Sequence, residues 1–143
     1  MLPEEIFLSH SSRDRKFADR LAETLRRHGI PVWYSRTNII GGQKWHDEIG
    51  AALKRCDWLV VVLSPNSVNS VWVKRELLYA LQQAHFQDKI VPIILAPCTY
   101  DRLSWTLSAL EVVDFTRSFE EGCRDLLRVW GIGLRPVRRS SRR

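Results

Sequence analysis

The chain has 143 residues, 45% of them hydrophobic and 27% charged, which fits one folded domain and excludes a disordered chain. Its formal net charge of +6 depends on residues 135–143, which hold five arginines and no acid; without them residues 1–134 carry +1. A nucleic-acid-binding domain carries its basic patch on the folded body, so we expect no specific nucleic acid partner.

The charge distribution also predicts a boundary. We expect residues 1–134 to form the domain and residues 135–143 to be a disordered Arg/Ser tail or linker. Such a tail keeps the protein soluble or binds polyanions weakly, and as a linker it would lead to a sensor domain.

Cysteine and histidine spacing argues against cross-links and metal sites. Cys56, Cys98 and Cys123 are odd in number and form no C-x-x-C pair, which favours free thiols in a reducing compartment. The four histidines lack ligand spacing, so we expect no metal. The sequence has no signal-peptide pattern at residues 1–12 and no apolar run of 18 residues, so we expect a cytoplasmic protein without a membrane partner.

The first quarter of the chain predicts a strand, a helix and a strand. The apolar run Ile6–Leu8 ends at a polar loop, and helical periodicity follows at Phe17, Leu21, Leu25 and His28. Ser11 with Asp14 resembles a capping box, and Gly29 stands where a C-cap glycine is expected. Pro31–Tyr34 is the second short strand.

The middle of the chain repeats this alternation. Residues 35–43 form a loop, and a second amphipathic helix follows, marked by Trp45, Ile49, Leu53 and Cys56. Asp57–Leu63 is a continuous apolar run, typical of a strand covered on both faces. After a break at 64–67, with Ser70 as a plausible N-cap, the third helix is marked by Val73, Leu77, Ala80, Leu81 and Ala84.

The last third predicts two more strands. Ile90–Leu95 is the fourth, although Pro92 lacks a donor and is expected at an edge or a bulge. Leu103–Leu110 indicates a short helix and Val112–Phe115 a fifth strand. The final helix has a capping box at Ser118 and Glu121 and an apolar stripe at Phe119, Cys123, Leu126 and Trp130.

Five alternations of strand and helix predict an α/β fold: a single flavodoxin-like three-layer domain, with a central five-stranded parallel sheet and helices on both faces. In such folds ligands bind beyond the carboxyl ends of the strands. We therefore expect the functional residues in the segments that follow the first four strands, 9–12, 35–43, 64–71 and 96–101.

Common activities of this architecture lack their motifs here. A phosphoacceptor receiver needs acids after its first and third strands to hold Mg²⁺, whereas these strands end at Ser9-His10 and Ser64-Pro65. The phosphate loop GxxxxGK(S/T), the dinucleotide loop GxGxxG and the hydrolase elbow GxSxG are all absent.

Five segments, in order, resemble those of a TIR (Toll/interleukin-1 receptor homology) domain of the bacterial, enzyme-competent type. Residues 6–14 (IFLSHSSRD) are similar to the first box, residues 29–34 (GIPVWY) to the second strand, and residues 38–45 (NIIGGQKW) to the BB loop. The segments LVVVLS, 59–64, and SVWVKREL, 70–77, are similar to the third strand and the W-x-x-x-E stretch. The order holds across residues 4–130.

The resemblance implies an enzyme that cleaves NAD⁺ at the nicotinamide–ribose bond, with NAD⁺ as substrate and no cofactor. Glu76 matches the catalytic glutamate of W-x-x-x-E. The resemblance also implies that BB-loop residues gate the cleft and contact a second protomer, so that self-association completes the active site; these are Asn38, Ile39, Ile40, Gly41 and Gly42.

One carboxylate suffices for this chemistry. Nicotinamide leaves NAD⁺ as a neutral molecule and needs no general acid, whereas the ribose becomes an oxocarbenium-like cation that a carboxylate stabilises. Trp72 lies four residues before Glu76 on the same helix face, and an aromatic wall beside an acid suits a flat cation.

Each candidate also has an ordinary structural explanation. Glu76 alone could be a surface glutamate, and Trp72 a core aromatic. Trp45, which the resemblance places against adenine, could be a core residue of its helix. The remaining candidates for substrate binding could equally be caps and loop residues: Ser9, His10 and Ser70.

The leading hypothesis is thus a cytosolic TIR enzyme of bacterial immunity that yields ADP-ribose or a cyclic ADP-ribose signal. The alternatives are a non-catalytic scaffold that binds other TIR domains through the BB loop, and a subunit that needs a partner protein for activation.

Overall fold

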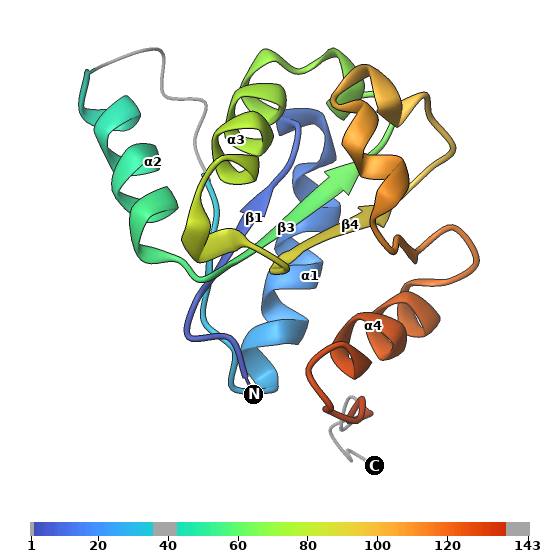
Figure 1. Ribbon diagram of the computed structural model, residues 1–143. Coiled ribbons are helices and arrows are strands. Elements are labelled where there is room, and N and C mark those ends of the chain that lie inside the picture. Colours follow the sequence, from blue (N-terminus) through green and yellow to red (C-terminus); the bar gives the residue numbers. More distant parts are fainter. Residues whose placement is uncertain (1, 36–42, 137–143) are drawn as a thin grey trace.

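The computed structural model describes residues 2–35 and 43–136, and the side chains of all of these except 43–45 (Figure 1). Its strands are β1 (Ile6–Ser9), β2 (Val32–Trp33), β3 (Trp58–Leu63), β4 (Ile90–Ile94) and β5 (Val113–Asp114). Its helices are α1 (Arg15–Arg27), α2 (Gln43–Arg55), α3 (Val71–Leu81) and α4 (Phe119–Arg128). None of the described helices is long and apolar enough to cross a membrane.

The five strands form one parallel sheet in the order β2-β1-β3-β4-β5, as predicted. Ile6 of β1 pairs with Val32 on one side and with Trp58 on the other. From β1 the sheet extends to β2 on one side and to β3, β4 and β5 on the other, so the topological switch point lies between β1 and β3.

Side chains alternate between the two faces of the sheet, and helices cover both. One core holds Ile6, Leu8, Val60 and Val62 against α1 and α4, which contribute residues such as Leu21, Leu25, Leu126 and Leu127. The other holds Phe7, Leu59, Val61 and Leu63 against α2 and α3, which contribute residues such as Ile49, Leu53, Val73 and Leu77. The predicted three-layer architecture is confirmed (Figure 1).

Helix caps follow the sequence with one exception. Ser70 and Ser118 cap α3 and α4 by accepting the N–H of Val73 and Glu121, and Gly29 has φ +82° after α1. The predicted capping box at Ser11 and Asp14 is wrong, because Asp14 makes no cap bond and its carboxylate turns instead toward the loop after β3.

Pro92 lies in an inner strand, so its predicted edge or bulge position is wrong. Leu95 donates its N–H to Leu63 of β3, whereas Ile94 faces the other way and accepts the N–H of Phe115. Backbone groups of alternate residues share a side, so the nitrogen of Pro92 faces β5, which begins only opposite Ile93. The proline therefore removes no hydrogen bond to β3.

At two places the structure differs from the predicted helices, in the type of helix or in where the helix ends. The segment predicted as a helix at Leu103–Leu110 contains the 3₁₀ turn Trp105–Ala109, with Leu107 buried and Trp105 78% exposed, so it lacks the apolar stripe of an α-helix. Ala84 lies beyond α3, in the 3₁₀ turn Ala84–Phe86, because the backbone turns extended at Gln83.

Candidate active site

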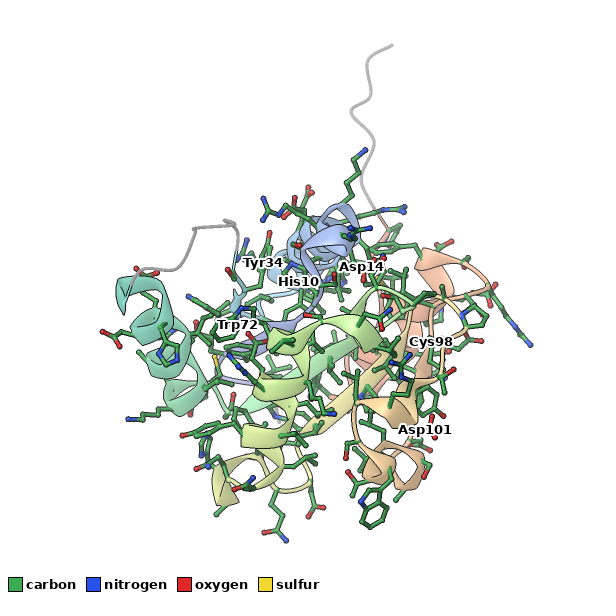
Figure 2. The ribbon with its side chains drawn as sticks, turned by 90° about the horizontal axis from the view of Figure 1, so that it is seen from above. His10, Asp14, Tyr34, Trp72, Cys98 and Asp101 are labelled. Atoms are coloured by element: carbon green, nitrogen blue, oxygen red, sulfur yellow. The ribbon has the colours of Figure 1, made fainter. Side chains whose placement is uncertain are left out.

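The candidate site lies at the carboxyl edge of the sheet, where β1 and β3 diverge. Figure 2 looks onto this edge, with His10, Asp14, Tyr34 and Trp72 around it. Open α/β sheets bind ligands at this position, since the loops that leave the switch point part from one another.

Glu76 and Ser9 meet at the centre of this edge. The Ser9 hydroxyl donates a hydrogen bond to Oε1 of Glu76 across 2.7 Å, joining the end of β1 to the second turn of α3. Ser9 is 1% exposed and Glu76 is 8% exposed. Glu76 is buried because it lies on the same helix face as Val73, Leu77 and Ala80, which pack against the sheet.

Burial raises the pKa of the Glu76 carboxyl from 4.5 to about 7, although the Ser9 hydrogen bond acts in the opposite direction. Among the described residues, no cation forms an ion pair with Glu76. A buried carboxyl with a pKa near neutrality at this edge of the sheet is a candidate for electrostatic and acid–base chemistry.

Trp72 connects α3 to α2. Its half-buried ring lies edge-on to the ring of His46, with 5.9 Å between centroids, and the guanidinium of Arg75 lies 5.2 Å from the centroid of the Trp72 ring. Trp72 precedes Glu76 by one helical turn, so an aromatic surface and a buried acid share one side of α3.

His10 continues from Ser9 and contacts Tyr34 at the end of β2. The ring centroids are 5.6 Å apart, and the Tyr34 hydroxyl donates a 2.6 Å hydrogen bond to Asp19 of α1. Burial lowers the pKa of the His10 imidazole, an effect that the nearby carboxylates of Asp14 and Asp19 oppose. A lowered pKa favours the neutral form of the His10 imidazole at neutral pH, in which one ring nitrogen donates a hydrogen bond and the other accepts one.

A second buried network borders the site. Asp14 accepts the hydroxyl proton of Ser64 across 2.6 Å and the side-chain amide of Asn66 across 2.8 Å. Cys98 lies near this network, and burial, with a smaller contribution from Asp14, raises the pKa of its thiol. Cys56 and Cys123 are buried, and burial raises the pKa of each thiol to about 12.

The structure brings some of the predicted site residues together and leaves others aside. Ser9 and Glu76 are in direct contact, His10 follows Ser9, and Trp72 precedes Glu76 on α3. The Ser70 hydroxyl accepts the N–H of Val73 as a helix cap. The BB-loop residues Asn38, Ile39, Ile40, Gly41 and Gly42, and the Trp45 side chain, lie outside the described residues.

Sequence reasoning places Ser64 and Asn66 in the segment beyond the third strand without giving either a role, and it does not place Asp14 and Tyr34 at this edge. A signal is available, because Asp14 and Ser64 follow the first and third strands, whose carboxyl ends the fold rule places side by side. Local pattern instead favours a helix cap for Asp14 and a simple strand break at Ser64.

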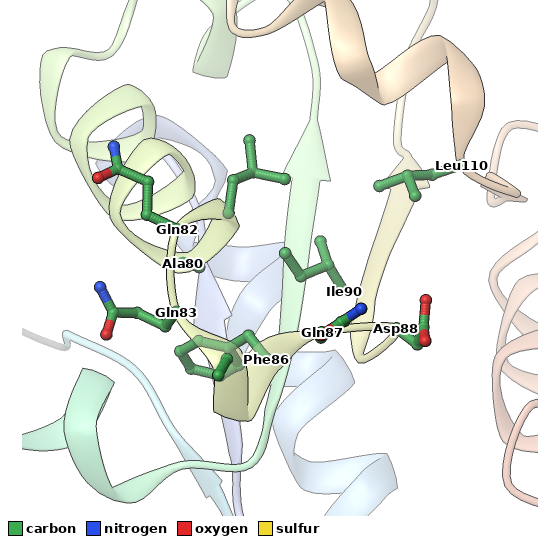
Figure 3. A pocket seen from close by; sticks show the side chains of 10 residues that line it. Ala80, Gln82, Gln83, Phe86, Gln87, Asp88, Ile90 and Leu110 are labelled. Atoms are coloured by element: carbon green, nitrogen blue, oxygen red, sulfur yellow. The ribbon is translucent and has the colours of Figure 1, made fainter.

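The opposite, amino edge of the sheet holds a separate hollow of about 430 Å³. It lies between the end of α3 and the start of β4, with Phe86, Ile90 and Leu110 in its wall and Gln82 and Gln87 beside them (Figure 3). Within residues 2–35 and 43–136, no group of three or more His, Cys, Asp or Glu side chains could hold a metal ion.

Comparison with known proteins identifies one family. The family model described as "TIR domain" matches residues 6–127 of the chain. This range covers all five strands and nearly all of α4, and it agrees with the range of the resemblance found in the sequence.

Several curated relatives are named as NAD(+) hydrolases or as 2′ cyclic ADP-D-ribose synthases. The chain is 29% identical to the NAD(+) hydrolase PdTIR of Paracoccus denitrificans over 140 residues, covering 89% of the chain and 44% of the relative. It is 34% identical to the 2′ cyclic ADP-D-ribose synthase AbTIR of Acinetobacter baumannii over 74 residues, covering 51% of the chain and 28% of the relative. The chain spans less than half the length of these curated relatives.

Solved structures share the fold at lower identity. The TIR domain of the Toll-related receptor TRR-2 from Hydra magnipapillata superposes with a TM-score of 0.69 at 20% identity, covering 87% of the chain and 95% of that domain. The TIR domains of the activated Roq1 resistosome superpose with a TM-score of 0.68 at 17% identity, covering 89% and 99%.

Proposed function

This chain belongs to the TIR domain family, and from that premise we propose that it cleaves NAD⁺ at the bond between nicotinamide and ribose. The observation that carries the proposal is the buried Glu76 carboxyl at the switch point, hydrogen-bonded to Ser9 and without a cation partner among the described residues. Burying an uncompensated carboxyl costs stability, which is typical of a functional site.

The reaction needs little from the protein on the leaving-group side. The bond from ribose C1′ to the nicotinamide nitrogen breaks with both electrons going to that nitrogen, and nicotinamide leaves uncharged. The ribose develops positive charge, which the Glu76 carboxylate would stabilise in a partly dry cleft.

The nucleophile that attacks C1′ must lose a proton. Attack by the oxygen of water gives ADP-ribose, whereas attack by a group of the same nucleotide gives a cyclic product. A carboxyl whose pKa is about 7 can accept that proton near neutral pH, so Glu76 can serve both the cation and the nucleophile.

Other residues would hold the substrate. We assign the neutral His10 to the hydroxyl or phosphate groups of the nucleotide, and the Trp72 ring to the nicotinamide. The Ser9 hydroxyl already donates to Glu76, so a further contact would use its lone pairs, whereas the Ser70 hydroxyl accepts the N–H of Val73 and could donate its own proton to the substrate. Trp45 would stack on the adenine end.

We further propose that self-association controls activity, with residues 38–42 contacting a second copy of the chain. A cleft completed by two protomers is incomplete in the monomer, so specific activity should rise with protein concentration. Constant specific activity over a hundredfold dilution would argue against this part of the proposal.

The test is NAD⁺ consumption by concentrated or bead-attached protein, with products resolved by chromatography and mass spectrometry. Glu76→Gln keeps the size of the side chain and removes its charge, so we expect turnover to fall by about 10²- to 10⁴-fold. The matched control is Glu23→Gln, an exposed glutamate of α1 that should leave turnover unchanged.

The outcomes separate the alternatives. Turnover that survives in Glu76→Gln would show that another residue or a contaminant is responsible. No turnover in the wild type, even when crowded, would favour a non-catalytic scaffold or a subunit that awaits a partner protein.

A further inference from the structure

An aspartate carboxylate accepts hydrogen bonds at each end of strand β3. One is Asp57, directly before the strand, and the other is Asp14, from the segment after β1. At the amino end of β3, Asp57 accepts the backbone N–H groups of Glu4 and Glu5 at 3.0 Å each. At its carboxyl end, Asp14 accepts protons from Ser64 and Asn66. Both attachments use an aspartate carboxylate as the acceptor, but only the second is joined by hydrogen bonds to the start of α3.

The attachment at the carboxyl end of β3 is buried, and the groups present fix the direction of its hydrogen bonds. Asp14 is 7% exposed and Ser64 is 1% exposed. A carboxylate cannot donate, so the Ser64 proton must point to Asp14. The Ser64 oxygen in turn accepts the backbone N–H groups of Asn66 and Ser67, at 3.2 and 3.1 Å, which uses its remaining hydrogen-bonding capacity.

A continuous run of hydrogen bonds leads from this attachment to α3. The Ser67 hydroxyl accepts the N–H of Ser64 and donates to its carbonyl oxygen. The N–H of Ser70 donates to the carbonyl of Ser67, and Ser70 then caps α3. Glu76 lies on the second turn of that helix and meets Ser9, five residues before Asp14 in the chain.

Two contacts therefore connect this part of the chain with α3 and the segment that leads into it: the end of β1 contacts α3 through Ser9 and Glu76, and Asp14 contacts Ser64 and Asn66 before α3. We propose that Asp14 is a positioning residue, whose buried carboxylate fixes the start of α3 and thereby holds the Glu76 carboxyl against Ser9. Its effect on catalysis rests on the function proposed above, whereas its effect on Glu76 itself does not.

The substitution that tests this is Asp14→Asn. If the oxygen of the introduced amide accepts the Ser64 proton, the NH₂ group of that amide faces the NH₂ group of Asn66. If the introduced amide is turned over, its NH₂ group faces a Ser64 oxygen that already accepts two bonds. If Asn66 turns its own amide over, its oxygen accepts the introduced NH₂ group while Ser64 still donates. Asp14→Asn therefore keeps at best two neutral hydrogen bonds in place of two charge-assisted ones, which weakens the hold on the start of α3.

Asp57→Asn is the matched control. Its amide oxygen can keep both bonds that Oδ1 makes to Glu4 and Glu5, and the variant loses the 3.2 Å bond from Glu4 to Oδ2. Each variant thus replaces a carboxylate acceptor by a neutral amide at one end of the same strand, and they differ in whether that end is joined by hydrogen bonds to the start of α3.

The deciding readout is the titration of the Glu76 carboxyl itself. It is followed by ¹³C NMR or isotope-edited infrared spectroscopy on protein with labelled glutamate, and the signal is assigned by its loss in Glu76→Gln. We expect Asp14→Asn to move the titration midpoint by more than about half a pH unit, since either water enters or the Ser9 bond is lost. Asp57→Asn should leave it in place.

Where the wild type cleaves NAD⁺, kinetics provide a second readout. Asp14→Asn should lower kcat by about 10- to 100-fold with a much smaller change in KM, because a misplaced catalytic group affects the chemical step. If the wild type proves inactive, the proposed function fails, but the titration still decides whether Asp14 positions Glu76.

An unmoved midpoint in Asp14→Asn would overturn the inference, even if the variant is less stable. Equal shifts in Asp14→Asn and Asp57→Asn would overturn it as well, because they would show general loosening. Should Asp14→Asn fail to fold, Asn66→Ala removes the other bond to Asp14 from a half-buried position, and the same comparison is made with it.

Discussion

Carboxylates at the two edges of the sheet differ in their partners and in their burial. At the amino edge, Glu5 forms a two-pronged ion pair with Arg55, at 2.7 and 3.2 Å, and Asp57 accepts two backbone N–H groups. At the carboxyl edge, Glu76 is buried with a hydroxyl as its partner. At the amino edge, Glu5 is paired with a guanidinium and Asp57 with backbone N–H groups. At the carboxyl edge, burial raises the pKa of Glu76 to about 7.

The hollow at the amino edge and the titratable groups of the candidate site lie at opposite edges of the sheet. The cavity of about 430 Å³ lies at the amino edge, where its wall is apolar with glutamine amides and one aspartate, Asp88. The perturbed carboxyl, the neutral imidazole and the aromatic ring lie at the other edge. Electrostatics and the topology of the sheet identify the carboxyl edge as the candidate active site.

The largest effect we expect on stability is a pH dependence that comes from Glu76. Its folded-state pKa is raised from 4.5 to about 7, so its contribution is complete below pH 4.5 and is lost as the pH rises through 7. This amounts to about 3 kcal/mol. Urea unfolding at pH 5 and pH 8 should show this loss in the wild type relative to Glu76→Gln, and parallel curves would disprove it.

Next in size is the Ser9 hydrogen bond. Ser9→Ala leaves the buried carboxyl without its donor and should cost about 1–3 kcal/mol. It should also raise the pKa of Glu76 further, because that bond now lowers it. NAD⁺ cleavage would then fall at pH 7 and recover toward pH 9. Ser108→Ala, at an exposed hydroxyl, is the control and should change neither property.

A smaller effect is expected at the amino edge. Glu5→Gln breaks the ion pair with Arg55, whose side chain is 51% exposed, so the free energy of unfolding should fall by less than about 1 kcal/mol. Salt at 1 M should reduce that difference, and NAD⁺ cleavage should be unaffected. A large loss of activity would mean that the two edges are coupled.

The smallest effect concerns the turn that leads into β4. Asp88 has φ +62° at the third position of a turn closed by the bond from Lys89 to Phe86, a position that favours glycine. Asp88→Gly should raise the free energy of unfolding by less than about 1 kcal/mol, as measured by thermal melting. A clear loss of stability would indicate a role for the carboxylate.

Local sequence pattern predicts most of the fold because it reports short-range structure. The apolar run of β3, the periodicity of α1 and α4 and the caps at Ser70 and Ser118 all depend on neighbours within a few residues. The position of Pro92 is predicted wrongly because the pattern cannot show that β5 is too short to need its N–H.

The candidate site is harder to predict from the sequence, because local pattern does not report contacts between distant residues. Ser9 and Glu76 are 67 residues apart, and Asp14 and Ser64 are 50 apart, so no local spacing reports their contacts. Spacing alone leaves Glu76 as an ordinary surface glutamate, and family resemblance singles it out. Local pattern assigns Asp14 to a cap because an acid three residues after a serine fits that motif equally well.

The unequal burial of the three cysteines makes the carboxyl edge directly observable. Cys56 and Cys123 are shielded thiols, whereas Cys98 is partly exposed and lies close to Asp14, near the candidate site (Figure 2). A maleimide dye at mildly alkaline pH should therefore attach at Cys98 without any engineered cysteine. The native chain thus offers a single fluorescent reporter of events at this edge, from nucleotide arrival to the meeting of two copies.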